Sequence, residues 1–300
     1  MMNVLVFGSA NIDRTYAVDH IVQPGETISC ARFETHCGGK GFNQAIALSR
    51  AGAHVAFAGA IGPDGAMLEQ ALIAEGIDIS CLIHSDHPTG HAVIQVTPQA
   101  QNSIIIDRGA NASITPEDVD AAIGRFSPGD LIVLQNEISS FGEIITAAHE
   151  KGMVIALNPS PIDEALLSLD LSRVDYLLVN EIEGAALSGF EDPERILHAL
   201  HDSFPHTCIV LTLGGEGGML IETGGGFFCF EPLAVSPVDT TAAGDTFTGY
   251  FLAEAISGSD MAHALEMARI ASGISVTRHG AACSIPFRSE VEQYMEGDRR

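Results

Sequence analysis

The chain has 300 residues, a length that fits one large α/β domain or two domains of ordinary size. Lysine and arginine number 14 against 39 aspartates and glutamates, and the net charge of −25 disfavours both a nucleic-acid-binding face and a polybasic membrane anchor. Hydrophobic residues make up 46% of the sequence, which supports a packed core and excludes a disordered chain.

No apolar run approaches the roughly 18 residues needed to cross a bilayer. The first residues lack the basic region and cleavage site of a secretion signal, so they are expected to form a first β-strand. The six scattered cysteines include no C-x-x-C pair and are expected to be reduced thiols, neither disulfide-bonded nor bound to zinc. We therefore expect a soluble, cytoplasmic protein that binds neither nucleic acid nor membranes.

Short aliphatic segments alternate with helical patterns along most of the chain. Strands are predicted at 4–8, 54–60, 131–135, 154–158, 176–180 and 208–212, because these segments are apolar and bounded by turn residues. Helices are predicted at 42–50, 65–75, 140–150 and 181–187, followed by the glycines at 52, 76, 152 and 189. This alternation predicts an α/β fold with a mostly parallel sheet and helices on both faces.

Two segments, 15–36 and 91–107, contain strand patterns without helices between them. They predict a small antiparallel sheet built from two separated insertions, and such a sheet beside a cleft would serve as a lid. No repeat or linker divides the chain, so we expect one domain over 1–300 with a discontinuous lid.

The strongest chemical motif is D-T-T-A-A-G-D-T-F-T-G at 239–249. The helical pattern that follows it, with Gly258 beyond its end, predicts a helix N-terminus at 242–245 whose free N–H groups form an anion site. Asp245 has two interpretations: it is the N-cap of this helix, or it accepts a hydroxyl proton while the N–H groups hold the charge of a transferred phosphoryl group.

Two further motifs fit the ligand-binding edge of an α/β sheet. The run C-G-G-K-G-F-N-Q-A at 37–45 precedes a helix and brings backbone and the Lys40 ammonium toward a polar ligand, unless it is a plain glycine turn. Asn11 and Asp13 follow the first strand and would present an amide and a carboxylate to a polyol, although an Asx turn explains them equally well.

Two weaker motifs follow later strands. Asn180 and Glu183 fit a site for hydrated Mg²⁺ and phosphates, or simply a helix start with acidic residues in its first turn. The run T-L-G-G-E-G at 212–217 would wrap a nucleotide with backbone, or form a hairpin. A G-x-x-x-x-G-K-[ST] loop and a G-x-G-x-x-G motif are both absent from the sequence.

Together these motifs resemble the ribokinase-like (PfkB-type) family of sugar and nucleoside kinases. The likeness runs from residue 4 to about 287 and includes G-S-x-N-x-D, P-G-E-T, G-G-K-G-x-N-Q-A, G-A-N-A, L-Q-x-E, A-L-N-P, N-x-x-E, T-L-G and D-T-x-A-A-G-D. The resemblance implies an ATP-dependent kinase that phosphorylates the primary (O5) hydroxyl of D-ribose, giving ribose 5-phosphate and ADP. 2-Deoxyribose, another pentose or hexose, or a nucleoside are alternative acceptors.

The resemblance also implies roles for the matching residues. Asp245 would be the base, and Ala242, Ala243 and Gly244 would form the anion hole. The sugar would be held by Asn11, Asp13, Gly39, Lys40, Asn43, Glu137 and Asp245. The nucleotide site would comprise Asn180, Thr212, Gly214, Gly217 and Gly244, with Glu183 acting through Mg²⁺. An activating monovalent cation such as K⁺ would be held, mostly by backbone oxygens, at Asp239, Thr241, Ser275, Arg278, Gly280 and Ser284. The family's lid-to-lid pairing implies a homodimer.

A few residues depart from the family pattern. Phe42 stands where alanine is usual and either narrows the sugar pocket or packs under the helix, and packing is the favoured interpretation. Arg269 replaces an asparagine or histidine near the adenine, and Ser160 and Ile162 replace alanines. Two other classes are disfavoured: a silent sugar-binding regulator, because base and glycine run are both present, and a dinucleotide oxidoreductase, because G-x-G-x-x-G is missing.

Overall fold

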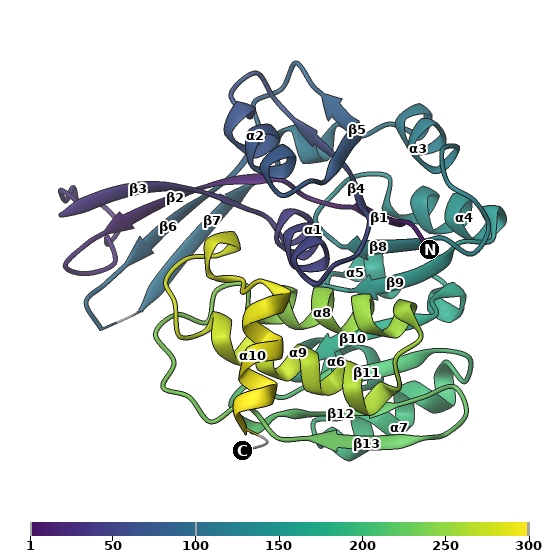
Figure 1. Ribbon diagram of the computed structural model, residues 1–300. Helices are drawn as coiled ribbons and strands as arrows, with labels where there is room; N and C mark the ends of the chain where they lie inside the picture. The colour runs from purple at the N-terminus through teal and green to yellow at the C-terminus, as the bar shows by residue number, and fades with distance from the viewer. Residues whose placement is uncertain (1, 100, 299–300) are drawn as a thin grey trace.

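The computed structural model describes residues 2–99 and 101–298 and contains a nine-stranded main sheet (Figure 1). Its strand order is β13-β12-β11-β10-β9-β8-β1-β4-β5. The bounds are β1 Val4–Phe7, β4 Val55–Ile61, β5 Asp78–His84, β8 Leu131–Gln135, β9 Val154–Asn158, β10 Tyr176–Asn180, β11 Cys208–Thr212, β12 Gly218–Ile221 and β13 Phe227–Phe230. Neighbouring strands from β11 to β5 are parallel, whereas β12 and β13 are added antiparallel. The mostly parallel sheet predicted from the sequence is confirmed.

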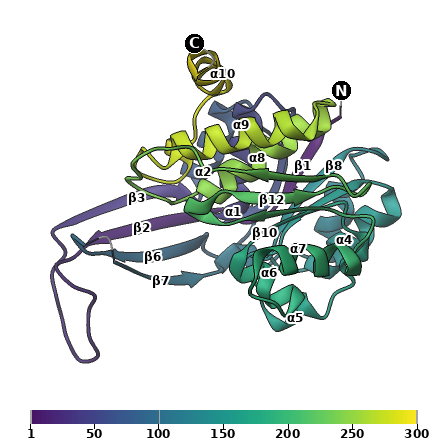
Figure 2. The same ribbon diagram turned by 90° about the horizontal axis from the view of Figure 1, so that it is seen from below.

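Helices cover both faces of the main sheet, as Figure 2 shows from below. On one face lie α1 Lys40–Arg50, α2 Ala66–Ala74, α8 Ala243–Ser257, α9 Met261–Ser275 and α10 Arg288–Asp298. The other face carries α3 Pro116–Ile123, α4 Phe141–Lys151, α5 Glu164–Leu167, α6 Glu181–Ser188 and α7 Pro193–Ser203. The side chains of β1 alternate between these layers: Val4 and Val6 join the first core, and Leu5 and Phe7 join the second.

A second, four-stranded sheet extends from the body in the order β3-β2-β6-β7 (Figure 1). Its strands are β2 Asn11–Ala17, β3 Arg32–Gly38, β6 Gly90–Val96 and β7 Asn102–Asp107. The prediction of a purely antiparallel sheet is wrong, because the central pair β2–β6 is parallel. Since β2 follows β1 and β6 follows β5, and β1 and β5 run in the same direction, both strands leave the main sheet from the same edge.

Turn chemistry explains where the elements end. The glycines at 52, 76, 152 and 189 all follow helices and have positive φ angles, which favour glycine and stop the helix. Four predicted strands, β8 to β11, coincide with the structure in both bounds. The sequence pattern did not locate β5, β12, β13, α3, α5, α7, α9 and α10.

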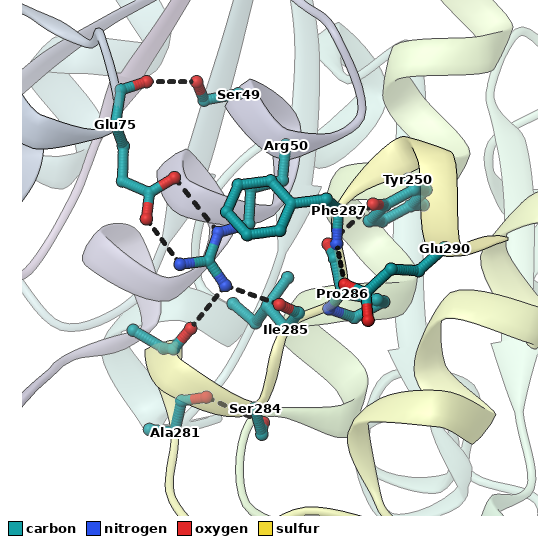
Figure 3. A network of polar contacts seen from close by, with 11 residues as sticks. Ser49, Arg50, Glu75, Tyr250, Ala281, Ser284, Ile285, Pro286, Phe287 and Glu290 are labelled. Atoms are coloured by element: carbon teal, nitrogen blue, oxygen red, sulfur yellow. Dashed lines mark hydrogen bonds and ion pairs between the residues drawn. The ribbon is translucent and has the colours of Figure 1, made fainter.

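Arg50, at the end of α1, ties α2 and the segment after α9 to the first helix layer (Figure 3). Its guanidinium donates to both carboxylate oxygens of Glu75 and to the carbonyls of Ala282 and Ile285. The same group lies 4.5 Å from the centre of the Phe287 ring. Because Arg50 and Glu75 are only 12% and 18% exposed, this pair is poorly screened by solvent.

We expect Arg50→Met to lower the free energy of unfolding by about 2–4 kcal/mol, because it leaves a half-buried carboxylate and two carbonyls without donors. Arg173→Met is the matched control: its pair with Asp170 is 36% and 64% exposed, so solvent screens it and the substitution is expected to change the free energy of unfolding far less. Urea unfolding curves of the two variants measure both losses. Equal losses of unfolding free energy in the two variants would mean that the contacts of Arg50 with Glu75, Ala282 and Ile285 do not stabilise the packing of the first helix layer.

Candidate active site

The N-terminus of α8 forms one wall of a cavity of about 250 Å³. Ala242 is the N-cap and adopts a left-handed conformation, with φ 60°, which is uncommon for a residue other than glycine. Asp245 is the third residue of the helix, so its interpretation as the N-cap is wrong. The residues 242–245 line the cavity, where the first N–H groups of the helix have no intrahelical acceptor, although that of Ala243 donates to the Thr240 carbonyl over 3.2 Å. This helix end can bind an anion.

The Asp245 carboxylate is held by two amides from the first turn of α1. Asn43 Nδ2 donates to one carboxylate oxygen over 3.0 Å, and Gln44 Nε2 donates to the other over 2.9 Å. The side chain of Asp245 is 7% exposed, so these hydrogen bonds replace most of its water. Helices α1 and α8 approach closely enough for them because Gly249 has no side chain: a Cβ there would lie 2.4 Å from Ala47 Cβ.

The glycine run places the start of α1 against the end of β1. Gly39 has φ 95° and a Cβ there would lie 2.9 Å from the Ser9 carbonyl oxygen, so only glycine fits this position. The helix begins at Lys40 itself, two residues earlier than predicted. Phe42 is fully buried in the core, which confirms that it packs under the helix.

Asn11 and Asp13 lie in β2 at alternate positions, so both point to the same face of the small sheet. The alternative interpretation as an Asx turn is wrong, because both residues belong to β2, which begins after the three residues 8–10 that follow β1. Asn111 Nδ2 donates to Asn11 Oδ1 over 2.8 Å. Burial, together with the charges of Glu137 and Asp245, raises the pKa of Asp13 to about 7. Three carboxyl groups from three separate segments are therefore gathered at this point.

A single ammonium group balances part of that negative charge. Burial lowers the pKa of Lys40, but the nearby charges of Asp245, Glu137 and Glu183 outweigh it, so the pKa is raised above its usual value. Lys40 therefore remains a cation at neutral pH. Its own backbone N–H donates over 3.1 Å to Glu137, which also accepts a hydrogen bond from Ser9 Oγ.

A larger groove of about 480 Å³ lies on the other side of the α8 N-terminus and shares part of its wall with the first cavity. Thr212, Gly214 and Gly217 line it, as do Arg269 and the apolar residues Phe230, Pro232, Leu233, Ala234, Val235, Pro237, Phe247 and Val276. The 212–217 run forms the predicted hairpin alternative, since β11 and β12 pair antiparallel across it. The 212–217 run therefore forms a hairpin and lines the groove at the same time. Arg269 is bonded to Glu266 at the groove wall.

Asn180 and Glu183 form a reciprocal capping box at the start of α6. Asn180 Oδ1 accepts from the N–H groups of Ile182 and Glu183, and Glu183 Oε2 accepts from the Asn180 N–H. The helix-start interpretation is therefore correct as structure. Both residues also line the smaller cavity, so this cap faces the site.

The residues expected around a monovalent cation come from two loops that lie side by side. Asp239 accepts hydrogen bonds from the Thr241 N–H, the Thr241 hydroxyl and the Gly280 N–H, the last over 2.9 Å. Burial raises the pKa of Asp239, but these hydrogen bonds outweigh it and hold the pKa below its usual value. The Ser275 and Ser284 hydroxyls are buried and donate to nearby carbonyls, whereas the Arg278 side chain pairs with Glu290.

Four polar residues around the site were not assigned a role from the sequence. They are Gln44, Asn111, Gln135 and Asn158, which contact Asp245 or Asn11 directly or through one another. All four stand inside quoted motifs: G-G-K-G-x-N-Q-A, G-A-N-A, L-Q-x-E and A-L-N-P. The motif letters were therefore the available signal, but only the fold reveals which atoms they contact.

The model of the pfkB family of carbohydrate kinases matches residues 1–288. A ribokinase of Haemophilus influenzae is 34% identical over 97% of both chains, and a deoxyribokinase of Salmonella typhi is 30% identical over 98% of this chain and 99% of its own. Among solved structures, the ribokinase of Cryptococcus neoformans var. grubii in complex with ADP has a TM-score of 0.87 at 33% identity, covering 98% of this chain and all of that one. The Arabidopsis thaliana ribokinase complexed with ribose and ATP has a TM-score of 0.84 at 30% identity, covering 98% and 99%.

The chain belongs to the pfkB family of carbohydrate kinases. Its activity is of the kind that this family performs, the transfer of phosphate to a sugar hydroxyl. Within the described residues, no helix is long and apolar enough to cross a membrane.

The raised pKa of Asp13 predicts that this carboxyl lowers the stability of the folded protein at neutral pH. Below pH 3.8 the Asp13 carboxyl is neutral in both the folded and the unfolded protein. As the pH rises from 3.8 to about 7, the carboxyl ionises more readily in the unfolded protein, so the free energy of unfolding falls. Asp13→Asn is therefore expected to leave stability unchanged near pH 4 and to raise it at pH 8, by at most about 4 kcal/mol for a shift of roughly three pKa units. Urea unfolding at both pH values measures this difference. A loss of stability at pH 8 would contradict it.

Proposed function

We propose that the protein is an ATP-dependent ribokinase that phosphorylates O5 of D-ribose, giving ribose 5-phosphate and ADP. The observation that carries this proposal is the position of Asp245, between a cluster of polyol-binding groups and a helix N-terminus suited to a phosphoryl group. The proposed sugar contacts are Asn11, Asp13, Gly39, Lys40, Asn43, Glu137 and Asp245. Relatives named ribokinase, over nearly the full length of the chain, support this acceptor.

One buried atom supports a hydroxyl-bearing ligand beside Asp245. Asn43 Nδ2 is bonded to Asp245, whereas Asn43 Oδ1 is buried and accepts no hydrogen bond from the described residues. A buried acceptor without a partner is costly, and a sugar hydroxyl would supply the missing donor.

In the proposed reaction, Asp245 orients the acceptor hydroxyl and takes its proton. A primary alcohol is far too weak an acid to lose its proton to a carboxylate beforehand, so the transfer occurs late, as the phosphoryl group moves. The N–H groups of Ala242, Ala243 and Gly244 would stabilise the charge on that group. Alignment and charge stabilisation would supply most of the acceleration, and proton transfer to Asp245 about 10²–10⁴-fold.

The larger groove is the proposed ATP site. Its apolar lining would surround the adenine, and Thr212, Gly214, Gly217 and Gly244 would lie toward the phosphates. Asn180 and Glu183 fit a hydrated Mg²⁺, because one Glu183 oxygen is fixed by the helix cap while the buried residue faces the cavity. When bound, the ion would neutralise phosphate charge, which the net charge of −25 otherwise repels.

The loops at 239–241 and 275–284 fit a monovalent cation such as K⁺. The side-chain oxygens of Asp239, Thr241, Ser275 and Ser284 already take part in hydrogen bonds, so the proposed ligands are the main-chain carbonyl oxygens of Asp239, Thr241, Arg278 and Gly280. Carbonyl oxygens suit a hard, weakly charged ion. When bound there, the cation would stiffen the loop that leads directly into the α8 N-terminus.

We further propose that the chain is one domain over 1–300 whose small sheet acts as a lid and pairs with that of a second copy. Ile104, Ile105 and Ile106 on the edge strand β7 are 51–65% exposed, and Phe33 on β3 is 50% exposed. An apolar edge strand of this kind favours association with another sheet. The free thiols of all six cysteines fit the reducing cytoplasm.

Asp245→Asn is expected to lower kcat by at least about 100-fold while ribose affinity changes by less than about tenfold, because the amide still accepts a hydrogen bond but cannot take the proton. A coupled assay of ADP release gives kcat, and calorimetry gives the affinity for ribose. Wild-type turnover by this variant would refute the assignment of the base. In the same assay, wild-type enzyme that prefers 2-deoxyribose to ribose would favour the alternative acceptor.

Ile105→Lys is expected to shift the protein from dimer to monomer in sedimentation velocity, because a charge would replace an apolar contact between sheets. Ile73→Lys, at an exposed position of α2, is the control and is expected to leave the dimer intact. A wild-type monomer at micromolar concentration would contradict the proposed pairing.

A further inference from the structure

A chain of buried amides links the main sheet to Asp245. Gln135, the last residue of β8, donates from Nε2 to Gln44 Oε1 over 2.6 Å. Gln44 Nε2 in turn donates to Asp245 over 2.9 Å and to Asn158 Oδ1 over 3.2 Å. Gln44 and Gln135 are fully buried, so water cannot replace any of these partners.

One backbone carbonyl sets the direction of every hydrogen bond in this row of amides. Asn158 Nδ2 donates over 3.0 Å to the carbonyl of Leu178, which can only accept. Asn158 must therefore turn its oxygen toward Gln44, and Gln44 must meet it with its NH₂ group. Since Gln44 Oε1 then faces Gln135, that residue must also present its NH₂ group. The same NH₂ group of Gln44 is the donor to Asp245, so the carboxylate receives a donor and never an amide oxygen.

This arrangement has a cost that packing alone does not explain. Gln135 Oε1 is buried and has no hydrogen-bond partner among the described residues. The space around it is closed: a Cβ on Gly8 would lie 2.0 Å from this oxygen. An apolar pair in place of the two glutamines would avoid the unsatisfied oxygen and would remove both partners of the bond between them, but it would also take away the Gln44 donor to Asp245 and Asn158. A network retained at such a cost is a feature expected of functional sites.

We propose that Gln44 and Gln135 are positioning residues for phosphoryl transfer that act through Asp245. Gln44 fixes one carboxylate oxygen while Asn43 fixes the other, so that the plane of the carboxylate cannot rotate away from the acceptor hydroxyl. Gln135 prevents Gln44 from turning its oxygen toward the carboxylate. This inference rests on the proposed function, in which Asp245 is the base.

A double-mutant cycle separates positioning from a structural role. Gln44→Leu is expected to lower kcat about 10- to 100-fold, the effect of one hydrogen bond to a charged group, while the KM for ribose changes less than about threefold. In an Asp245→Asn background the same substitution is expected to change kcat less than about threefold, because the group it positions has already been lost. Equal losses of kcat in both backgrounds would overturn the inference and leave the function of Asp245 standing. If Asp245→Asn itself retains wild-type kcat, the proposed function fails first.

Two further variants keep the test decisive. Gln135→Leu is expected to lower kcat about 3- to 10-fold without weakening ribose binding in calorimetry, and wild-type kcat would exclude Gln135 from the role. Should Gln44→Leu fold poorly, the double variant Gln44→Leu/Gln135→Leu removes both partners, and it is expected to fold and to show the kcat loss of Gln44→Leu. Thr207→Val, which removes a buried hydrogen bond to the Val174 carbonyl at the opposite end of β11, is the control and is expected to retain wild-type kcat.

Discussion

The contact between the first turn of α1 and the Asp245 carboxylate is the interaction on which the site depends. It joins the glycine run near the end of β1 to the start of α8, two segments separated by about 200 positions in the sequence. The contact requires two helices to pack almost backbone to backbone, which Gly249 makes possible opposite Ala47. The groups proposed to bind the sugar and those proposed to bind the phosphate therefore meet at one carboxylate.

The parallel sheet explains why these groups converge. The carboxyl ends of parallel strands meet at one edge, and β8, β9, β10 and β11 end there at Gln135, Asn158, Asn180 and Thr212. The small sheet continues from that edge and brings Asn11 and Asp13 to the same place. Several carboxylates are thus gathered around one lysine in a strongly acidic protein. Such clustering destabilises the folded chain, as the raised pKa of Asp13 indicates, and is the usual cost of a binding site for a polar ligand.

The sequence predicted the features that local chemistry determines. Apolar strands, helix-ending glycines and the helix start near residue 242 all follow from neighbouring residues, and the structure confirms them. The direction of β6 relative to β2 depends instead on how two distant strands leave the main sheet. The same holds for Gln44, whose role depends on Gln135, Asn158 and Asp245 meeting in space. The motif letter marks that glutamine, but no local pattern indicates which atoms it contacts.

The central claim is that Asp245 meets the hydroxyl that receives the phosphoryl group. A crystal structure of the protein with ribose and a non-hydrolysable ATP analogue tests it most directly, through the distance from the Asp245 carboxylate to each hydroxyl oxygen of the sugar. The account predicts O5 within hydrogen-bond reach of Asp245, about 2.6–3.2 Å, and directed at the terminal phosphorus. A ribose whose O5 faces away from Asp245, or whose nearest contact with it is another hydroxyl, would contradict the account.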